Sequence, residues 1–238
     1  MTKTTSLLLL AAGLAVNAVP AAAQTTKNIF VDVNVGIQSA SRTFVVAGAQ
    51  TVYDESAIFS TSHEVGSAPT IEVNGGYRVW RDLSVGVGFS HASTSSDATM
   101  SASVPHPLFH DRRLASSVTA EGVMHTEKTV YLQAIWTVPV TDKIDVSFMG
   151  GPSFINVSQE LVTSITVAAG TQTAAAVLET QTDTATGFNV GADLSYLLSP
   201  RYGVGGFVRY VGGEVGIPSV QELKVGGFQV GGGLRLRF

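Results

Sequence analysis

The last eleven residues of the chain constrain its fold more than any other stretch. The segment 228–238, FQVGGGLRLRF, alternates between apolar residues and residues that are polar or small. Successive side chains of an extended strand point to opposite faces, so this alternation predicts a β-strand with one apolar face. The other face carries Arg235 and Arg237, two residues apart. A strand of this kind separates an apolar environment from a wet one, as in a membrane β-barrel.

Seven earlier segments repeat the same alternation. We expect strands near residues 28–39, 71–79, 83–90, 129–138, 144–148, 188–196 and 202–210. Short connections alternate with long ones, which are expected at 40–68, at 95–118 and, as a β-hairpin, at 161–182. The segment Gly150-Gly151-Pro152 obscures the alternation, and we expect a β-bulge there. The fold predicted is all-β: an eight-stranded antiparallel up-and-down transmembrane β-barrel with short periplasmic turns and long extracellular β-hairpin loops.

Aromatic side chains recur at matched depths on the apolar face. Tyr202 and Tyr210 lie eight residues apart, and so do Phe188 and Tyr196. Eight residues span about 26 Å of strand, and a tilt of roughly 40° reduces this to about 20 Å, close to the height of a barrel's apolar band. The chain therefore predicts an aromatic girdle at the membrane boundaries. Its members are Trp136, Tyr196, Tyr202 and Tyr210.

The first 23 residues have the pattern of a secretory signal. Lys3 precedes a nearly continuous apolar run from Leu7 to Val19, and 21–23 are alanines, so we expect cleavage before Gln24 and one barrel domain over 24–238. The chain has 14 basic and 18 acidic residues and no cysteine. Removal of Lys3 leaves 13 against 18, a net charge of −5, which argues against nucleic acid as a partner.

The final strand also resembles a known signal. Bacterial outer-membrane barrels end in an aromatic residue preceded by apolar residues at alternate positions, and the barrel-assembly machinery recognises that pattern. The matching residues are Phe228, Val230, Leu234, Leu236 and Phe238. Together with the strand pattern, they make the chain similar to the eight-stranded barrel family that contains the transmembrane domain of outer membrane protein A and the small barrels X and W. The resemblance implies the bacterial outer membrane as location and its lipid and lipopolysaccharide as partners.

Charged residues with lumen-facing parity occur in both signs. They are Asp32, Glu72, Arg78, Glu127, Asp145, Asp193, Arg209, Arg235 and Arg237. An eight-stranded barrel is only wide enough for side chains to fill it, and a buried charge needs a partner. We therefore expect an ion-paired, closed lumen with no cofactor and no metal, and a structural or surface-interaction role carried by the external loops. The alternative is a narrow channel or a conduit for small solutes.

Two motifs suggest other chemistry. His91 and Ser93 project on one face, and lipid A deacylases of the eight-stranded type have a similar pair, but here no acid has the parity to orient the histidine. The loop segment 104–113 contains His106, His110 and Asp111, which could be metal ligands. Its two prolines favour an extended loop over a helix that would align the histidines. We therefore predict a non-enzymatic barrel, with a lipid A-modifying hydrolase as the less favoured alternative.

Overall fold

Ten strands make up most of the computed structural model, which describes residues 28–167, 174–217 and 220–238. In chain order they are β1 (Ile29–Ser39), β2 (Arg42–Val52), β3 (Glu55–Val65), β4 (Ala68–Trp80), β5 (Leu83–Pro105), β6 (Arg113–Pro139), β7 (Ile144–Val167), β8 (Ala174–Leu197), β9 (Tyr202–Ile217) and β10 (Val220–Arg237). The signal predicted at 1–23 lies outside the described residues. Within those residues no helix is long and apolar enough to cross a membrane.

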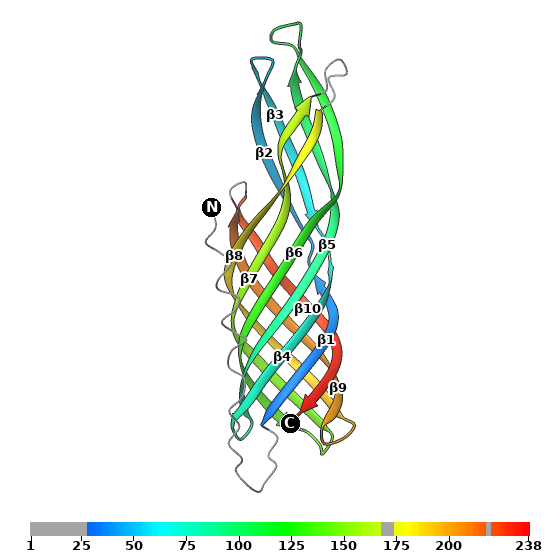
Figure 1. Cartoon of the computed structure of the whole chain (residues 1–238), viewed down its shortest axis with the longest axis vertical. Helices are drawn as coiled ribbons and strands as arrows, with labels where there is room; N and C mark the ends of the chain where they lie inside the picture. Colours follow the sequence, from blue (N-terminus) through cyan, green and yellow to red (C-terminus); the bar gives the residue numbers. More distant parts are fainter. Residues whose placement is uncertain (1–27, 168–173, 218–219) are drawn as a thin grey trace.

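Eight of the ten strands close into a ring. The order of pairing is β5, β4, β1, β10, β9, β8, β7 and β6, and β6 pairs again with β5. The first and last strands of the chain lie side by side, with Val33 opposite Leu234. All of these pairings are antiparallel, and the strands are tilted around a long barrel (Figure 1). The predicted up-and-down architecture is confirmed.

The eight predicted strands form this ring, and two further strands, β2 and β3, lie outside it. The segment 40–68, expected as a long connection, contains the hairpin β2–β3, whose turn residues Tyr53 and Asp54 have φ of 51° and 62°. Positive φ at both central residues matches the twist of a two-residue hairpin turn. β3 also pairs with β5, with Ile58 opposite Ser103. The alternation in β3 was hidden because its buried face includes Thr61 and His63 as well as apolar residues.

The other two long connections are mostly strand. β5 continues to Pro105 and β6 begins at Arg113, so the segment expected as a loop at 95–118 is a paired hairpin with a short tip. The hairpin expected at 161–182 consists of the upper parts of β7 and β8, and its turn lies outside the described residues. Six strands thus rise above the barrel as an extension, whereas the β9–β10 hairpin ends well below them (Figure 1).

The bulge expected at Gly150-Gly151-Pro152 is wrong. The β6–β7 register is the same on both sides of it, with Ala134 opposite Gly150 and Tyr131 opposite Ser153. The lack of a side chain at Gly151 instead lets the β6 backbone at Leu132 approach closely. The β7–β8 register shifts higher up, between Val162 and Ser164.

The two faces of the barrel differ as the alternation predicts. On β8 the outward residues Phe188, Val190, Leu194 and Tyr196 are exposed, while Asn189, Asp193 and Ser195 are buried in the lumen. The same division holds on β10, where Phe228, Val230 and Leu234 are exposed and Gln229 and Arg235 are buried. An exposed apolar band around a buried polar interior is the inverse of a soluble protein, and it fits a barrel surrounded by lipid.

The extension above the barrel has a core of its own. Its sheet β2–β3–β5–β6 and the ribbon β7–β8 enclose a cluster of buried apolar side chains, namely Ala57, Phe59, Met100, Ala102, Val104, Val162, Ile165 and Ala174. Side-chain hydrogen bonds also join the sheet to the ribbon. The backbone N–H of Ile165 donates to Gln50 (3.1 Å), and that of Ala174 donates to the Ser116 hydroxyl (3.3 Å). The extension is therefore a packed unit rather than a set of separate loops.

Candidate functional site

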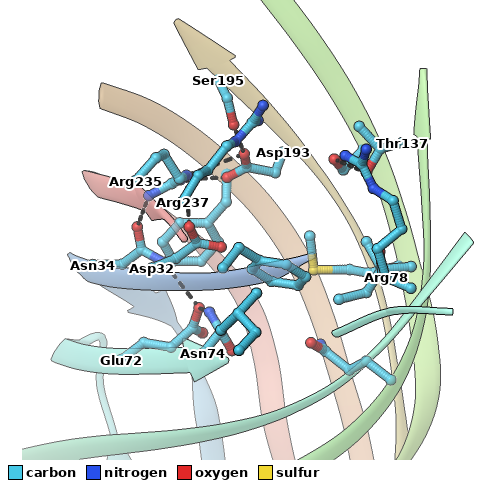
Figure 2. A pocket seen from close by; sticks show the side chains of 18 of the residues that line it. Asp32, Asn34, Glu72, Asn74, Arg78, Thr137, Asp193, Ser195, Arg235 and Arg237 are labelled. Atoms are coloured by element: carbon cyan, nitrogen blue, oxygen red, sulfur yellow. Dashed lines mark hydrogen bonds and ion pairs between the residues drawn. The ribbon is translucent and has the colours of Figure 1, made fainter. Parts of the chain in front are cut away.

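The lumen near the short-turn end is organised around Arg235, whose side chain is 2% exposed. Its guanidinium ion-pairs with Asp193, donates to the Asn34 amide oxygen (2.6 Å) and lies 3.8 Å from an Asp32 carboxylate oxygen. The Ser195 hydroxyl donates to Asp193 (2.7 Å). β1, β8 and β10 bring these side chains together across the lumen (Figure 2). Arg235 thus offsets two acids at once, which reduces the cost of burying all three charges.

A second cluster lies deeper in the lumen around Glu72. Its carboxylate ion-pairs with Arg209 and accepts hydrogen bonds from the side-chain amides of Asn34 (3.1 Å) and Asn74. The central carbon of the Arg209 guanidinium lies 4.5 Å from the centre of the Tyr131 ring. Asn34 also contacts Arg235, so it links this cluster to the first. The guanidinium, stacked on an aromatic ring and paired with a carboxylate, fills the barrel cross-section.

The remaining predicted lumen charges divide into paired and unpaired residues. Arg237 pairs with Asp145 (2.7 Å) at the short-turn end. Arg78 lines the same cavity but lies across it from Arg235 (Figure 2), and it makes no ion pair within the described part of the chain. The inclusion of Arg78 in the ion-pair network is therefore wrong. Residue 78 follows the alternation and lines the lumen cavity, but the stagger of the strands brings no carboxylate of the described residues into ion-pair distance of it.

Glu127 belongs to a third cluster, where the lumen meets the extension. It accepts from Gln38 (2.7 Å) and from the backbone N–H of Gly226 (3.1 Å), and it contacts His125 (3.0 Å) and Arg42 (3.5 Å). Sequence reasoning missed two of these partners, Arg42 and His125. Arg42 was assigned to a loop, and His125, which has the same strand parity as Glu127, was not included among the lumen residues.

A polar relay links the second and third clusters. The Tyr131 hydroxyl bonds to Ser90 (2.7 Å) and donates to Gln229 (3.3 Å), and Gln229 donates to Gln38 (2.8 Å). Above it, a cluster of apolar side chains closes the mouth of the barrel. This cluster contains Val46, Ile155, Val157, Leu161, Val211, Val215, Leu223 and Val225. The upper lumen is therefore blocked by packed side chains.

The free space in the lower lumen is small. The cavity lined by Asp32, Glu72, Arg78, Arg209 and Arg235 has a volume of about 60 Å³. By the same measure one water needs about 10–15 Å³, so the cavity has room for a few waters. A cavity of this size provides no path for a solute.

The aromatic residues predicted as a girdle lie on the outer surface. Near the short-turn end Trp136, Tyr196 and Tyr202 are exposed, and the Trp136 ring lies 6.1 Å from that of Phe148. Tyr210 is also exposed on the outer face. A girdle at the two membrane boundaries stays a prediction.

The hydrolase alternative lacks an assembled site in the described residues. The Ser93 hydroxyl is bonded to that of Thr126 (3.1 Å) and not to His91. His91 lies opposite Lys128 on β6 and Ile71 on β4, and no carboxylate pairs with it. A serine nucleophile needs a histidine within hydrogen-bond reach and an acid that orients it. Neither condition is met here.

The three metal-ligand candidates separate at the tip of the extension. His106 accepts a hydrogen bond from the backbone N–H of Leu108 (3.1 Å), whereas His110 contacts Glu55 (2.9 Å) and Asp111 (3.6 Å). Donor atoms of Glu55, His110 and Asp111 lie within 4.8 Å of one another and could hold a divalent cation. The side chains of His110 and Asp111 are 80% and 88% exposed, and exposed groups of this kind commonly lie together without a metal ion. Glu55 was missed because it lies on another hairpin.

Comparisons with known proteins agree with this architecture. Residues 8–236 match the family model of the outer membrane protein beta-barrel domain. No curated protein matches the sequence. Among solved structures, Neisserial surface protein A is 15% identical over 88% of this chain and 97% of its own, with a TM-score of 0.47. OprG from Pseudomonas aeruginosa is 10% identical over 89% of this chain and 96% of its own, also with a TM-score of 0.47. The outer membrane protease OmpT from Escherichia coli is 10% identical over 92% of this chain and 99% of its own, with a TM-score of 0.38.

Proposed function

The chain belongs to the outer membrane protein beta-barrel domain family and lies in the bacterial outer membrane, and on this basis we propose that it is a closed, non-enzymatic stalk for surface contacts. The barrel anchors the protein, and the extension holds a small contact surface above the membrane. Signal cleavage before Gln24 and recognition of the final strand by the barrel-assembly machinery belong to the same proposal. The observation that carries it is the combination of a plugged lumen with a packed extension.

The side chains that fill the lumen favour a role of the barrel as a membrane anchor. Arg209, Glu72 and Tyr131 occupy the cross-section of the lumen, and the apolar cluster at the barrel mouth lies above them. A path for solutes through the lumen would leave a buried charge without its partner or displace packed apolar side chains. Either change costs several kcal/mol. A barrel built to conduct would keep a continuous wet lumen instead.

The extension favours a role in contacts with other surfaces. A rigid scaffold with an exposed tip is a common way of presenting a binding surface. At the β5–β6 tip, Leu108 and Phe109 are 81% and 55% exposed. Neither lies near the apolar band, so lipid of the protein's own membrane does not cover them. Exposed apolar side chains at the outermost point of a surface protein favour contact with another apolar or amphipathic surface.

Two measurements test the proposal. In planar bilayers the purified protein should show no steady single-channel current, and steady currents that disappear in Arg209→Ala would refute the closed stalk in favour of a narrow channel. For the tip, cells displaying Leu108→Ser/Phe109→Ser should adhere less to polystyrene than cells displaying the wild type. Leu198→Ser is the matched control, because Leu198 is exposed in a short turn at the other end of the barrel. Equal adherence of the tip variant and the control would refute the contact role.

A further inference from the structure

A buried histidine, His125, lies where β6 passes from the barrel into the extension. Its side chain is 6% exposed, and both of its ring nitrogens are engaged. Nδ1 lies 2.6 Å from the side-chain oxygen of Gln159 on β7, and Nε2 lies 3.0 Å from a carboxylate oxygen of Glu127. A neutral imidazole has one donor nitrogen and one acceptor nitrogen. It can therefore satisfy two acceptor oxygens only if it carries a second proton.

The Gln159 side chain presents its oxygen, not its nitrogen, to the histidine. Its amide nitrogen donates to the backbone carbonyl of Glu160 (2.9 Å), so the oxygen is the atom that is left to face Nδ1. A reversed amide would bring the side-chain oxygen against the carbonyl oxygen of Glu160, and two acceptors do not bond to each other. Nδ1 of His125 therefore has to be a donor.

Glu127 is surrounded by donors, which keeps its carboxylate ionised. It accepts from the side-chain amide of Gln38 (2.7 Å), from the backbone N–H of Gly226 (3.1 Å) and from the guanidinium of Arg42 (3.5 Å). Several hydrogen bonds to a carboxylate favour its charged form, and a proton on Glu127 would compete with these donors. The proton between Glu127 and His125 therefore belongs to the ring, and Nε2 is a donor as well.

Other titratable or charged side chains on the strands of this region have different partners or are exposed to solvent. Within the described part of the chain they include His63 on β3, Lys128 on β6, Glu160 on β7, Asp183 on β8, Glu214 on β9 and Lys224 on β10. Glu160 accepts from the backbone N–H of Met124 (2.9 Å), and the His63 ring stacks on that of Phe44. The remaining four are exposed, and the β5 residue opposite His125 is the uncharged Thr94. The charge state of His125 therefore depends mainly on Glu127 and Arg42.

The strands joined by this cluster come from both parts of the molecule. Glu127 binds Gln38 on β1, Arg42 at the start of β2 and Gly226 on β10, and His125 adds Gln159 on β7. The β2–β3 hairpin and the β7–β8 ribbon belong to the extension, whereas β1 and the lower part of β10 belong to the barrel wall. The cluster is therefore placed to hold the extension on the barrel.

We propose that His125 is an imidazolium and that its second proton closes a clamp between the barrel and the extension. When the pH rises and this proton is lost, one ring nitrogen presents a lone pair to an acceptor oxygen, and that contact becomes repulsive. The clamp is closed in the protonated state and loosens in the neutral state. This regulation goes beyond the stalk function proposed above, and its test does not measure adhesion.

Nuclear magnetic resonance of the full-length protein in nanodiscs, with ¹⁵N-labelled histidine, tests the protonation. The chain has five histidines, and the signals missing from His125→Gln identify those of His125. At neutral pH both of its ring nitrogens should carry hydrogen. In Glu127→Gln one of them should lose it, because the anion that holds the proton is gone. His91→Gln, a matched control outside the cluster, should leave the signals of His125 unchanged. A neutral His125 ring in the wild type at neutral pH would refute the proposal.

Amide hydrogen exchange tests the clamp, because the N–H of Gly226 donates to Glu127. Wild type and His125→Gln are compared at the same pH, which cancels the effect of pH on the intrinsic rate. At neutral pH Gly226 should exchange about tenfold more slowly in the wild type, since the variant lacks a charge-assisted contact to Glu127. The two rates should converge at alkaline pH.

Equal rates at neutral pH would show that the proton does not close a clamp, and the inference would be wrong. Heat-modifiable gel mobility verifies that the variant is folded. If it is not, the wild type alone gives the answer through the exchange rate of Gly226 relative to that of Gly191, which lies in the barrel wall between β7 and β9. This ratio should rise about tenfold from neutral to alkaline pH, and a constant ratio would overturn the inference.

Discussion

Replacement of Arg209 by methionine should destabilise the barrel strongly. The side chains of Arg209 and Glu72 are 1% and 2% exposed, and the substitution leaves the carboxylate with only the two amide donors of Asn34 and Asn74. Breaking a buried ion pair by removing one partner costs about 3–5 kcal/mol. Loss of the guanidinium from the Tyr131 ring accounts for about 0.5–2 kcal/mol within that figure. Glu72→Met should cost a similar amount, because it strands the guanidinium.

The double variant Arg209→Met/Glu72→Met distinguishes pairing from simple packing. It removes both charges and keeps the lumen filled, so its cost reduces to the side-chain amides of Asn34 and Asn74 that lose an acceptor, about 1–3 kcal/mol each. The double variant should therefore cost less than the sum of the two single variants, which is about 6–10 kcal/mol. Urea unfolding in lipid vesicles, followed by the fluorescence of Trp80 and Trp136, gives the free energies of unfolding.

A neutral substitution in the same layer serves as the control. Ser90→Ala removes a buried hydroxyl that bonds to Tyr131 and should cost only about 0.5–1.5 kcal/mol. If the cost of the double variant equals the sum of the two single variants, the charges are not coupled, and the account of the lumen as an ion-paired plug is wrong.

Three further predictions concern assembly, the extension and pH. Phe238→Lys should reduce assembled barrel, measured as heat-modifiable gel mobility, far more than Arg237→Ala; a charge at this boundary costs only about 0–1 kcal/mol, so equal assembly would show that Phe238 is not part of a recognition signal. Met100→Ala should destabilise the extension by about 2–5 kcal/mol and expose it to protease while the barrel stays folded; unchanged cleavage would contradict a packed core. His63 is buried in the extension, where no group of the described residues hydrogen-bonds to it, and burial lowers its pKa below 6.5. The unfolded extension therefore binds the proton first, and stability is lost as the pH falls below about 6.5. Protease resistance should decrease on acidification more in the wild type than in His63→Phe, and identical profiles would rule out His63 as the cause.

Several features of this protein follow from local sequence alone. The alternation around Val190 and Leu234 determines which residues face lipid, because a strand has a side-chain period of two in any tertiary context. The eight-residue separation of Tyr202 and Tyr210 sets the height of the apolar band for the same reason. Lumen parity also predicted that Glu72 and Arg209 are buried and need partners. These properties depend on neighbours along one strand, so no knowledge of the fold is required.

The choice of partners was decided only by the tertiary structure. Glu72 lies 137 residues from Arg209 and Asp193 lies 42 from Arg235, and these pairs meet because closure of the ring fixes the stagger of every strand. The same stagger brings no carboxylate of residues 28–167, 174–217 and 220–238 into ion-pair distance of Arg78. The β2–β3 hairpin was hidden for a related reason: its buried face mixes Thr61 and His63 with apolar residues, and it becomes an interior face only when β7 and β8 cover it. A side-chain pattern determines the face on which a residue lies, whereas shear and closure determine what that residue meets there.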